Sequence, residues 1–129
     1  MAGSLAEDGT KKILYVVKLG PDAAEYVYSA FYNAALGAAM EMDTTIYFLG
    51  RGPELLRKGA AEKIPLKESG TLKKFIDMAL NNGVKFMTCE LSLTSLCEMK
   101  PEDLIDGVKV VGAATLNDIA VESDAVISY

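Results

Sequence analysis

Short runs of β-branched and aromatic residues alternate with helix-forming segments along this chain, and no other feature of the sequence constrains its fold as strongly. The apolar runs that predict strands are residues 12–18, 45–49, 84–88, 108–112 and 125–128. The segments that predict helices are residues 22–42, 54–58, 71–81, 92–99 and 115–122. Asp22 is expected to cap the first of these helices, and Asp43 and Thr44 to break it before the next strand. Strands and helices in alternation form a parallel sheet covered on both faces, so we predict an α/β domain.

The length of 129 residues is enough for one domain with one core. We predict a flexible N-terminal tail at residues 1–10, which are small, polar and acidic, and a single domain at residues 11–129. The tail lacks the basic and apolar parts of a signal peptide, and no apolar run reaches the roughly 20 residues that span a bilayer. We therefore expect a cytoplasmic protein with no membrane partner.

The charge and the absence of histidine exclude several classes of function. A net charge of −5, with basic residues scattered in pairs, argues against a nucleic-acid surface. The sequence contains no histidine, which excludes a Ser-His-Asp or Cys-His catalytic pair and any zinc site that needs imidazole. Two cysteines cannot form a four-thiolate metal site within one chain, so we expect neither a metal nor a cofactor.

Cys89 is the strongest candidate for a functional residue. It follows a run that predicts a buried strand and precedes a segment that predicts a helix. Ligands of open α/β sheets bind beyond the carboxyl ends of the strands, where this cysteine is expected. A thiol at a helix N-terminus faces free backbone N–H groups and the positive end of the helix dipole, which favour its thiolate. The alternative is that Cys89 is a small, buried and unreactive apolar residue.

Cys97 and Arg51 are weaker candidates. Cys97 is expected in the core, with a resolving or relay thiol as the alternative. On one continuous helix it would lie about 12 Å from Cys89, beyond the reach of a disulfide. The sequence Gly50-Arg51-Gly52 lacks the third glycine of a dinucleotide-binding loop, so its glycines predict a tight turn. Arg51 is a candidate contact for an anionic sulfur group at this edge of the sheet.

The predicted helix at residues 22–42 is apolar on two sides. The first face carries Val27, Ala30, Phe31, Ala34 and Ala38. The second face carries Tyr28, Tyr32, Leu36, Ala39 and Met40. A helix with two apolar faces is buried on both, and the sheet can cover only one of them. We therefore expect a second subunit against the other face.

Several segments of the sequence are distinctive of a known family. They are Cys89–Leu93, Lys100–Val108, Gly112–Thr115 and Ser123–Ala125, preceded in the front half by a strand, a long alanine-rich helix and Ile46–Gly50. Over residues 11–129 this pattern resembles the DsrE/DsrF-like family, and most closely the branch often labelled predicted peroxiredoxins. The resemblance implies a three-layer α/β/α domain with a five-stranded parallel sheet, assembled as a homotrimer or homohexamer.

The resemblance also implies an activity, which is sulfur relay. The sulfur-carrying cysteine of the family maps onto Cys89, which would accept sulfane sulfur as a persulfide from a donor protein and pass it to an acceptor protein. Some members of the family lack this cysteine and act as structural partners. The resemblance assigns no role to Cys97.

Three functions follow as hypotheses, in order of preference. The first is a sulfur-carrier or sulfurtransferase subunit with Cys89 as the acceptor. The second is an oligomeric binding or scaffold subunit in which Cys89 only packs. The third is a thiol peroxidase, although only Arg51 and Cys97 could assist peroxide reduction.

Overall fold

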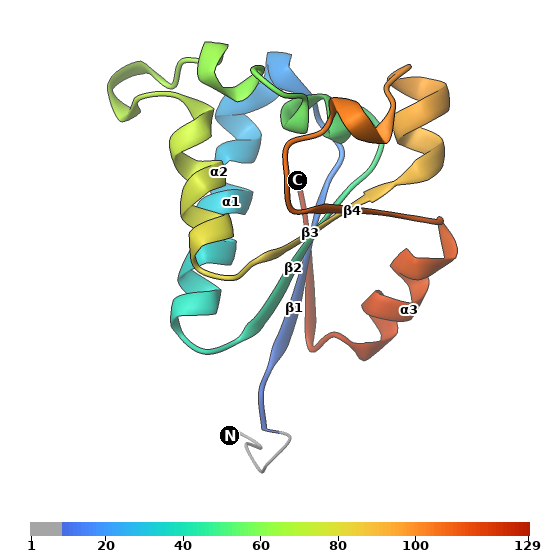
Figure 1. Cartoon of the computed structure of the whole chain (residues 1–129). Coiled ribbons are helices and arrows are strands. Elements are labelled where there is room, and N and C mark those ends of the chain that lie inside the picture. The colour runs from blue at the N-terminus through green and yellow to red at the C-terminus, as the bar shows by residue number, and fades with distance from the viewer. Residues whose placement is uncertain (1–8) are drawn as a thin grey trace.

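The computed structural model describes residues 9–129 and contains one parallel sheet between helices (Figure 1). Its strands are β1 (Lys12–Val17), β2 (Asp43–Phe48), β3 (Lys85–Cys89), β4 (Val108–Val111) and β5 (Ala125–Ser128). They lie side by side in the order β4-β3-β2-β1-β5, and every pair is parallel. The predicted α/β fold with five parallel strands is therefore confirmed. The first eight residues of the predicted tail lie outside the described residues.

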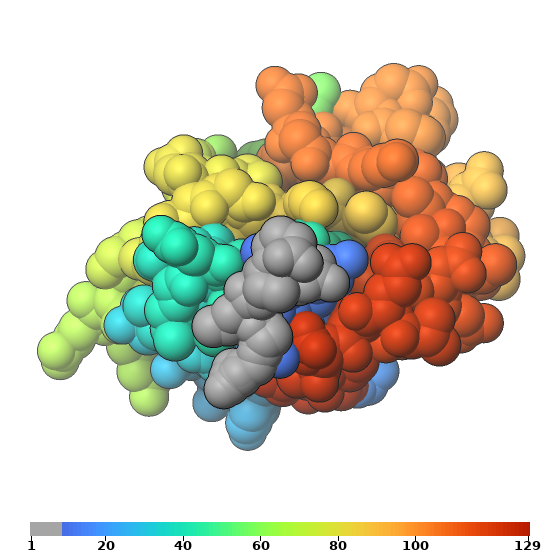
Figure 2. Space-filling view, turned by 90° about the horizontal axis from the view of Figure 1, so that it is seen from below, coloured from blue at the N-terminus to red at the C-terminus, as the bar shows by residue number. Residues whose placement is uncertain are grey.

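Helices cover the sheet on both faces and make a three-layer arrangement. The helices are α1 (Ala24–Ala39), α2 (Leu72–Asn81) and α3 (Ala114–Glu122). Helices α1 and α2 lie on one face, and α3 lies alone on the other (Figure 1). Seen from the amino ends of the strands, α3 and β5 form one side of the molecule, and the ends of α1 and α2 form the opposite side (Figure 2). Short helical turns fill the connections at the carboxyl ends of the strands.

The larger core lies between the sheet and the helix pair α1 and α2. At its centre, Phe31 of α1 packs against Phe48 of β2 and Phe86 of β3, with ring centroids 5.4–5.8 Å apart. The three phenylalanines are buried, and alternate residues of the central strands point into the same cluster. We call this side of the sheet the α1–α2 face.

The opposite side of the sheet, which we call the α3 face, has a smaller core. Its buried residues are Leu14, Val16, Tyr47 and Cys89. Helix α3 contributes only partly buried side chains to this cluster, and all four residues of β5 are exposed. The α3 face is therefore thinly covered in the single chain.

The boundaries of the first helix differ from the prediction. We expected Asp22 to be the N-cap, but Pro21–Ala23 forms a separate 3₁₀ turn and α1 begins at Ala24 without a side-chain cap. We also expected Asp43 and Thr44 to form a break between helix and strand. Instead both belong to β2, because the chain reverses earlier, at Glu41 with φ of 67°, and Asp43 already pairs with β1.

The two faces of α1 have different surroundings. Val27, Ala30, Phe31 and Ala34 are buried against the sheet, as predicted. Tyr28, Tyr32, Leu36 and Met40 remain exposed on the other face. The second subunit expected there stays a prediction. No helix within residues 9–129 is both long enough and apolar enough to cross a membrane.

Candidate functional site

Cys89 is the last residue of β3, and a helical segment begins at the next residue. Residues 90–91 are α-helical, and Ser92–Leu96 continues as a π-helical turn. Cys89 pairs in register with Val111, which is the last residue of β4. The thiol therefore lies at the carboxyl edge of the parallel sheet, at the place predicted from the sequence.

The surroundings of Cys89 favour its thiolate. The side chain is only 7% exposed, and this burial by itself raises the pKa of the thiol. Hydrogen bonds from the backbone N–H and hydroxyl of Ser92, from the N–H of Leu91 and from the hydroxyl of Tyr47 act in the opposite direction. Their combined effect exceeds that of burial, so the pKa of Cys89 is lowered. A lowered pKa increases the thiolate fraction, which is the nucleophilic form.

Tyr47 is a member of this site that the sequence analysis missed. Its ring is buried on the α3 face, and its hydroxyl donates to the carbonyl of Gly112 at 3.2 Å. Burial, followed by the negative charge and the hydrogen bond of Cys89, raises the pKa of Tyr47 to about 12. The hydroxyl therefore keeps its single proton at neutral pH, and it can turn this proton from the Gly112 carbonyl to the Cys89 sulfur when the thiolate forms. Only the register of β2 against β3 reveals that this tyrosine lies beside the thiol.

Ser92 connects the thiol to the turn that follows β2. Its Oγ accepts a hydrogen bond from the backbone N–H of Gly50 at 3.0 Å, which leaves its own proton for Cys89. Gly50 has φ of +58°, and a Cβ on it would lie 3.0 Å from the carbonyl of Lys18. The glycine predicted to form a tight turn is therefore required for that turn, and the turn holds Ser92 in position.

Cys97 packs in a different apolar cluster from Cys89. It belongs to the core cluster of the α1–α2 face, and its Sγ donates to the carbonyl of Gly50 at 3.3 Å. Burial and the neighbouring Glu54 carboxylate raise the pKa of this thiol, which keeps it protonated. Both cysteines are free. The structure places Cys97 in the core, which was the interpretation favoured by the sequence analysis. No disulfide bond links it to Cys89.

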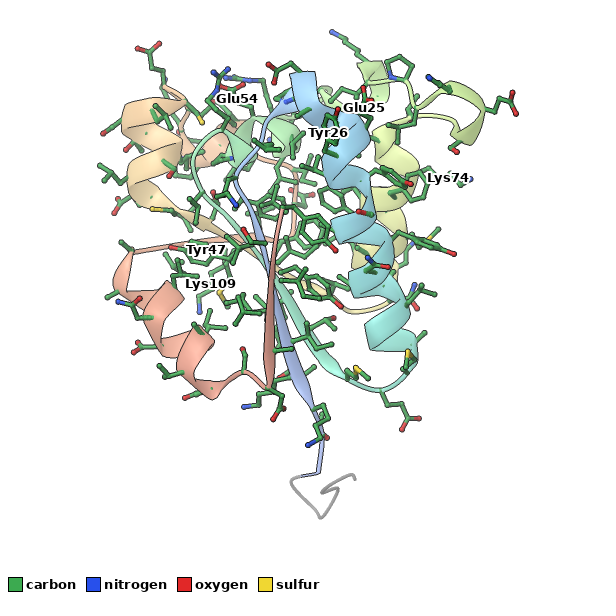
Figure 3. All side chains as sticks on the ribbon, turned by 180° about the vertical axis from the view of Figure 1, so that it is seen from behind. Glu25, Tyr26, Tyr47, Glu54, Lys74 and Lys109 are labelled. Carbon is green, nitrogen blue, oxygen red and sulfur yellow. The ribbon has the colours of Figure 1, made fainter. Side chains whose placement is uncertain are left out.

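Arg51 is engaged by a carboxylate of its own turn. Its Nε and Nη2 donate to the two carboxylate oxygens of Glu54, each at 2.8 Å. The carboxylate of Asp22 also acts on this guanidinium through its charge. Glu54 projects from the 52–56 turn above the carboxyl edge of the sheet (Figure 3). The suggested role of Arg51 as an anion contact for Cys89 stays a prediction.

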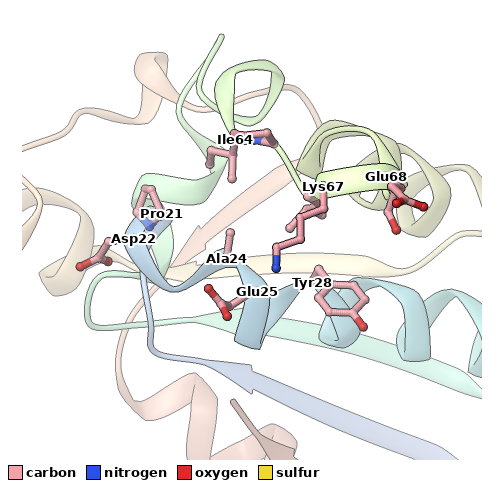
Figure 4. A pocket seen from close by; sticks show the side chains of 11 residues that line it. Pro21, Asp22, Ala24, Glu25, Tyr28, Ile64, Lys67 and Glu68 are labelled. Carbon is pink, nitrogen blue, oxygen red and sulfur yellow. The ribbon is translucent and has the colours of Figure 1, made fainter.

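One hollow of the described surface lies away from Cys89. It has a volume of about 560 Å³ and lies between the start of α1 and residues 64–69, with Pro21, Glu25, Tyr28 and Lys67 in its walls (Figure 4). Helix α1 covers the face of the sheet opposite to the thiol. Within residues 9–129, no three Cys, Asp or Glu side chains come together as metal ligands.

A comparison with models of known protein families shows to which family the chain belongs. The model of the DsrE/DsrF-like family matches residues 11–129. The chain belongs to the DsrE/DsrF-like family. This family is generally associated with sulfur relay.

Two solved structures have the same fold, and their names and that of one curated relative state no activity. The uncharacterized protein MJ0760 of Methanocaldococcus jannaschii is 28% identical over 96 residues, which are 74% of this chain and 34% of that protein. The chain thus spans about a third of the length of this curated relative. The crystal structure of the YchN protein from E. coli matches with a TM-score of 0.78 at 18% identity, over 93% of this chain and 100% of that one. The protein of unknown function MTH1491 from Methanobacterium thermoautotrophicum matches with a TM-score of 0.66 at 20% identity, over 93% and 99% of the two chains.

Proposed function

We propose that this protein carries sulfane sulfur as a persulfide on Cys89 and relays it to a partner. The observation that carries the proposal is the position of Cys89 at the carboxyl edge of the sheet, directly before a helical segment, where Leu91, Ser92 and Tyr47 act on its sulfur. These groups lower the pKa of a thiol that burial alone would keep protonated. The association of the family with sulfur relay supports the same chemistry.

The chemistry needs only a nucleophilic thiolate and a donor with a sulfur–sulfur bond. The Cys89 thiolate attacks the outer sulfur of a donor persulfide, and the donor leaves as a thiolate with the electrons of the broken bond. The product is a persulfide on Cys89, whose terminal sulfur is itself an anion. Transfer to an acceptor thiolate repeats the exchange and restores Cys89. No oxidant, metal or histidine is consumed or needed.

One observation favours the scaffold alternative. Because Cys89 is 7% exposed, a large donor cannot reach it without some opening of the surface. The thiol peroxidase alternative receives less support, because Cys97 packs in a different apolar cluster from Cys89 and its thiol donates to the carbonyl of Gly50.

Intact mass after incubation with a persulfide donor tests the proposal. The reduced protein is expected to gain one sulfur, roughly 32 Da, in the wild type and in Cys97→Ser. Cys89→Ser is expected to gain none, because it lacks the only nucleophile that the site provides. The two variants are matched, since each replaces one buried free cysteine by the same residue.

Two results would contradict the proposal. One is a sulfur adduct that persists in Cys89→Ser. The other is no adduct on the wild type, together with a Cys89 thiol that alkylates only after unfolding, which would favour the scaffold alternative.

A further inference from the structure

A closed ring of three hydrogen bonds joins Cys97 to Ser92, the residue that acts on the Cys89 thiol. The thiol of Cys97 donates to the carbonyl of Gly50 at 3.3 Å. The backbone N–H of Gly50 donates to Oγ of Ser92 at 3.0 Å. The carbonyl of Ser92 accepts a hydrogen bond from the backbone N–H of Cys97 at 2.9 Å, which closes the ring. Cys97 is therefore linked to Ser92 both through its backbone and through its side chain.

The ring connects two segments that are far apart in the sequence. Gly50 belongs to the turn that follows β2, whereas Ser92 begins the helical turn Ser92–Leu96 and Cys97 follows it. The two segments lie at the same end of the sheet (Figure 1), and residues 52–56 contact Ser92–Leu96. Two side-chain hydrogen bonds of the ring cross between the segments, one from the Cys97 thiol and one to the Ser92 hydroxyl. The Gly50 turn is thus held from both ends of Ser92–Leu96.

Ser92 is the member of the ring that reaches Cys89. Cys89 directly precedes a helical segment, so it occupies the N-cap position, where a side chain faces the N–H groups of the second and third helical residues. These residues are Leu91 and Ser92. Burial raises the pKa of the Cys89 thiol, but the N–H and hydroxyl of Ser92, followed by the N–H of Leu91, act against it and the pKa is lowered.

The hydrogen bond from Gly50 sets the direction of the Ser92 hydroxyl. A hydroxyl has one proton and two acceptor lone pairs. Because the Gly50 N–H occupies an acceptor position, the proton of Ser92 remains available for the Cys89 sulfur. The carbonyl of the same glycine is held by the Cys97 thiol. Loss of that donor would loosen the Gly50 turn and, with it, the Ser92 hydroxyl.

The Cys97 thiol is suited to this role because it keeps its proton. Burial, followed by the negative charge of Glu54, raises the pKa of Cys97, and the opposing charge of Arg51 does not reverse this effect. The pKa of Cys89 is lowered, so Cys97 is still a donor while Cys89 titrates.

Tyr47 of β2 is a titratable side chain that also acts on the Cys89 thiol. Burial raises the pKa of Tyr47 to about 12, so its hydroxyl keeps its proton while Cys89 titrates. The other members of the cluster around Cys89, from β1, β3, β4 and α3, are apolar, among them Val16, Met87, Val111 and Ile119. The pH dependence of a Cys89 reaction therefore reports the ionisation of the thiol itself.

We infer that Cys97 is a positioning residue for Cys89: its thiol holds the Gly50 turn, and the turn holds the Ser92 hydroxyl toward the Cys89 sulfur. The inference rests on the proposed function and specifies what keeps the thiolate of that function available. It gives Cys97 a role that neither core packing nor a resolving thiol includes. A residue at position 97 must then donate a hydrogen bond, which serine can do and alanine cannot.

The pH dependence of Cys89 alkylation by iodoacetamide tests this role with a size-matched pair of variants. Cys97→Ser and Cys97→Ala each leave Cys89 as the only cysteine of the chain. They differ by one hydroxyl group, which in serine can donate to the Gly50 carbonyl as the thiol does. The midpoint of the alkylation rate is expected about 0.5 pH unit higher in Cys97→Ala than in Cys97→Ser, because a loosened Ser92 hydroxyl stabilises the thiolate less.

A Ser92→Ala substitution shows whether the effect passes through Ser92. In the Cys97→Ser protein it should raise the midpoint by about one pH unit, because the thiolate loses a hydrogen bond to its charge. When Ser92 is alanine, Cys97→Ser and Cys97→Ala should have the same midpoint, since the hydroxyl on which position 97 acts is gone.

Thr94→Ala in the Cys97→Ser protein is the matched control. It removes a hydroxyl that donates to the carbonyl of Glu90 at 2.9 Å in the same helical segment but outside the ring. The midpoint should stay unchanged. Far-UV circular dichroism at each pH verifies that every variant is folded, so a shifted midpoint reports the thiol and not unfolding.

Two results would overturn the inference. One is an equal midpoint in Cys97→Ser and Cys97→Ala. The other is a difference between them that persists in full when Ser92 is alanine, because position 97 would then act on Cys89 by another route.

Failure of the proposed function has a different signature. Alkylation needs no sulfur donor, so the midpoints report the action of position 97 even where no persulfide donor adds the roughly 32 Da of one sulfur to either variant.

Discussion

Replacing Phe48 with alanine is expected to destabilise the domain by about 3–5 kcal/mol. Phe48 is fully buried at the centre of the α1–α2 face, with its ring centroid 5.8 Å from that of Phe31 and 5.4 Å from that of Phe86. Truncation removes both aromatic contacts and leaves a cavity between helix and sheet that a central strand cannot collapse to fill. Urea unfolding, followed by far-UV circular dichroism, measures the change in the free energy of unfolding.

A matched control for this variant is Tyr26→Ala on α1. Tyr26 is 67% exposed, so its truncation should change the free energy of unfolding by no more than about 0.5 kcal/mol. Equal effects of the two substitutions would show that the phenylalanine cluster is not the centre of the core.

Replacing Gly52 with alanine is the second change with a large expected effect, at about 3 kcal/mol of destabilisation. A Cβ on Gly52 would lie 2.5 Å from the carbonyl oxygen of Val17, a distance at which atoms overlap. The obstructing atom belongs to the backbone of a central strand, so the turn at residues 50–56 must move instead. That movement would also disturb Glu54 and Cys97, which pack beside it. Thermal and urea unfolding both report the loss.

Gly112→Ala provides the comparison, because a Cβ on Gly112 meets nothing within 4 Å. Its effect on the free energy of unfolding should stay within about 1 kcal/mol, in either direction. A Gly52→Ala protein as stable as Gly112→Ala would show that the close approach to Val17 is not present in solution.

The order of the strands and helices could be predicted from the sequence because each element carries a local pattern. The apolar runs at residues 12–18 and 84–88 are unbroken, as is typical of strands buried on both faces. The errors occurred where local chemistry and tertiary structure compete. Asp22 has the chemistry of an N-cap, yet Pro21 begins a 3₁₀ turn there, and Asp43 has the chemistry of a breaker but is drawn into β2 by pairing with β1.

The candidate site could be predicted only in part. Cys89 was found because a cysteine between a strand and a helix is visible in the sequence itself. Tyr47 was missed, since its proximity to the thiol depends on the register of β2 against β3. Arg51 was chosen for its charge and position at the sheet edge; its Nε and Nη2 donate to Glu54, and its role as an anion contact stays a prediction.

The most direct measurement is the pH dependence of Cys89 alkylation by iodoacetamide, made on Cys97→Ser protein. The thiolate is the reacting form, so the rate rises with pH and levels off above the pKa of Cys89. Because the donors from Leu91, Ser92 and Tyr47 outweigh the effect of burial, the midpoint should lie below the ordinary thiol value of 9.0, and Tyr47→Phe should move it to higher pH. A midpoint at or above 9.0, unchanged by Tyr47→Phe, would contradict a Cys89 thiol activated by its surroundings for sulfur transfer.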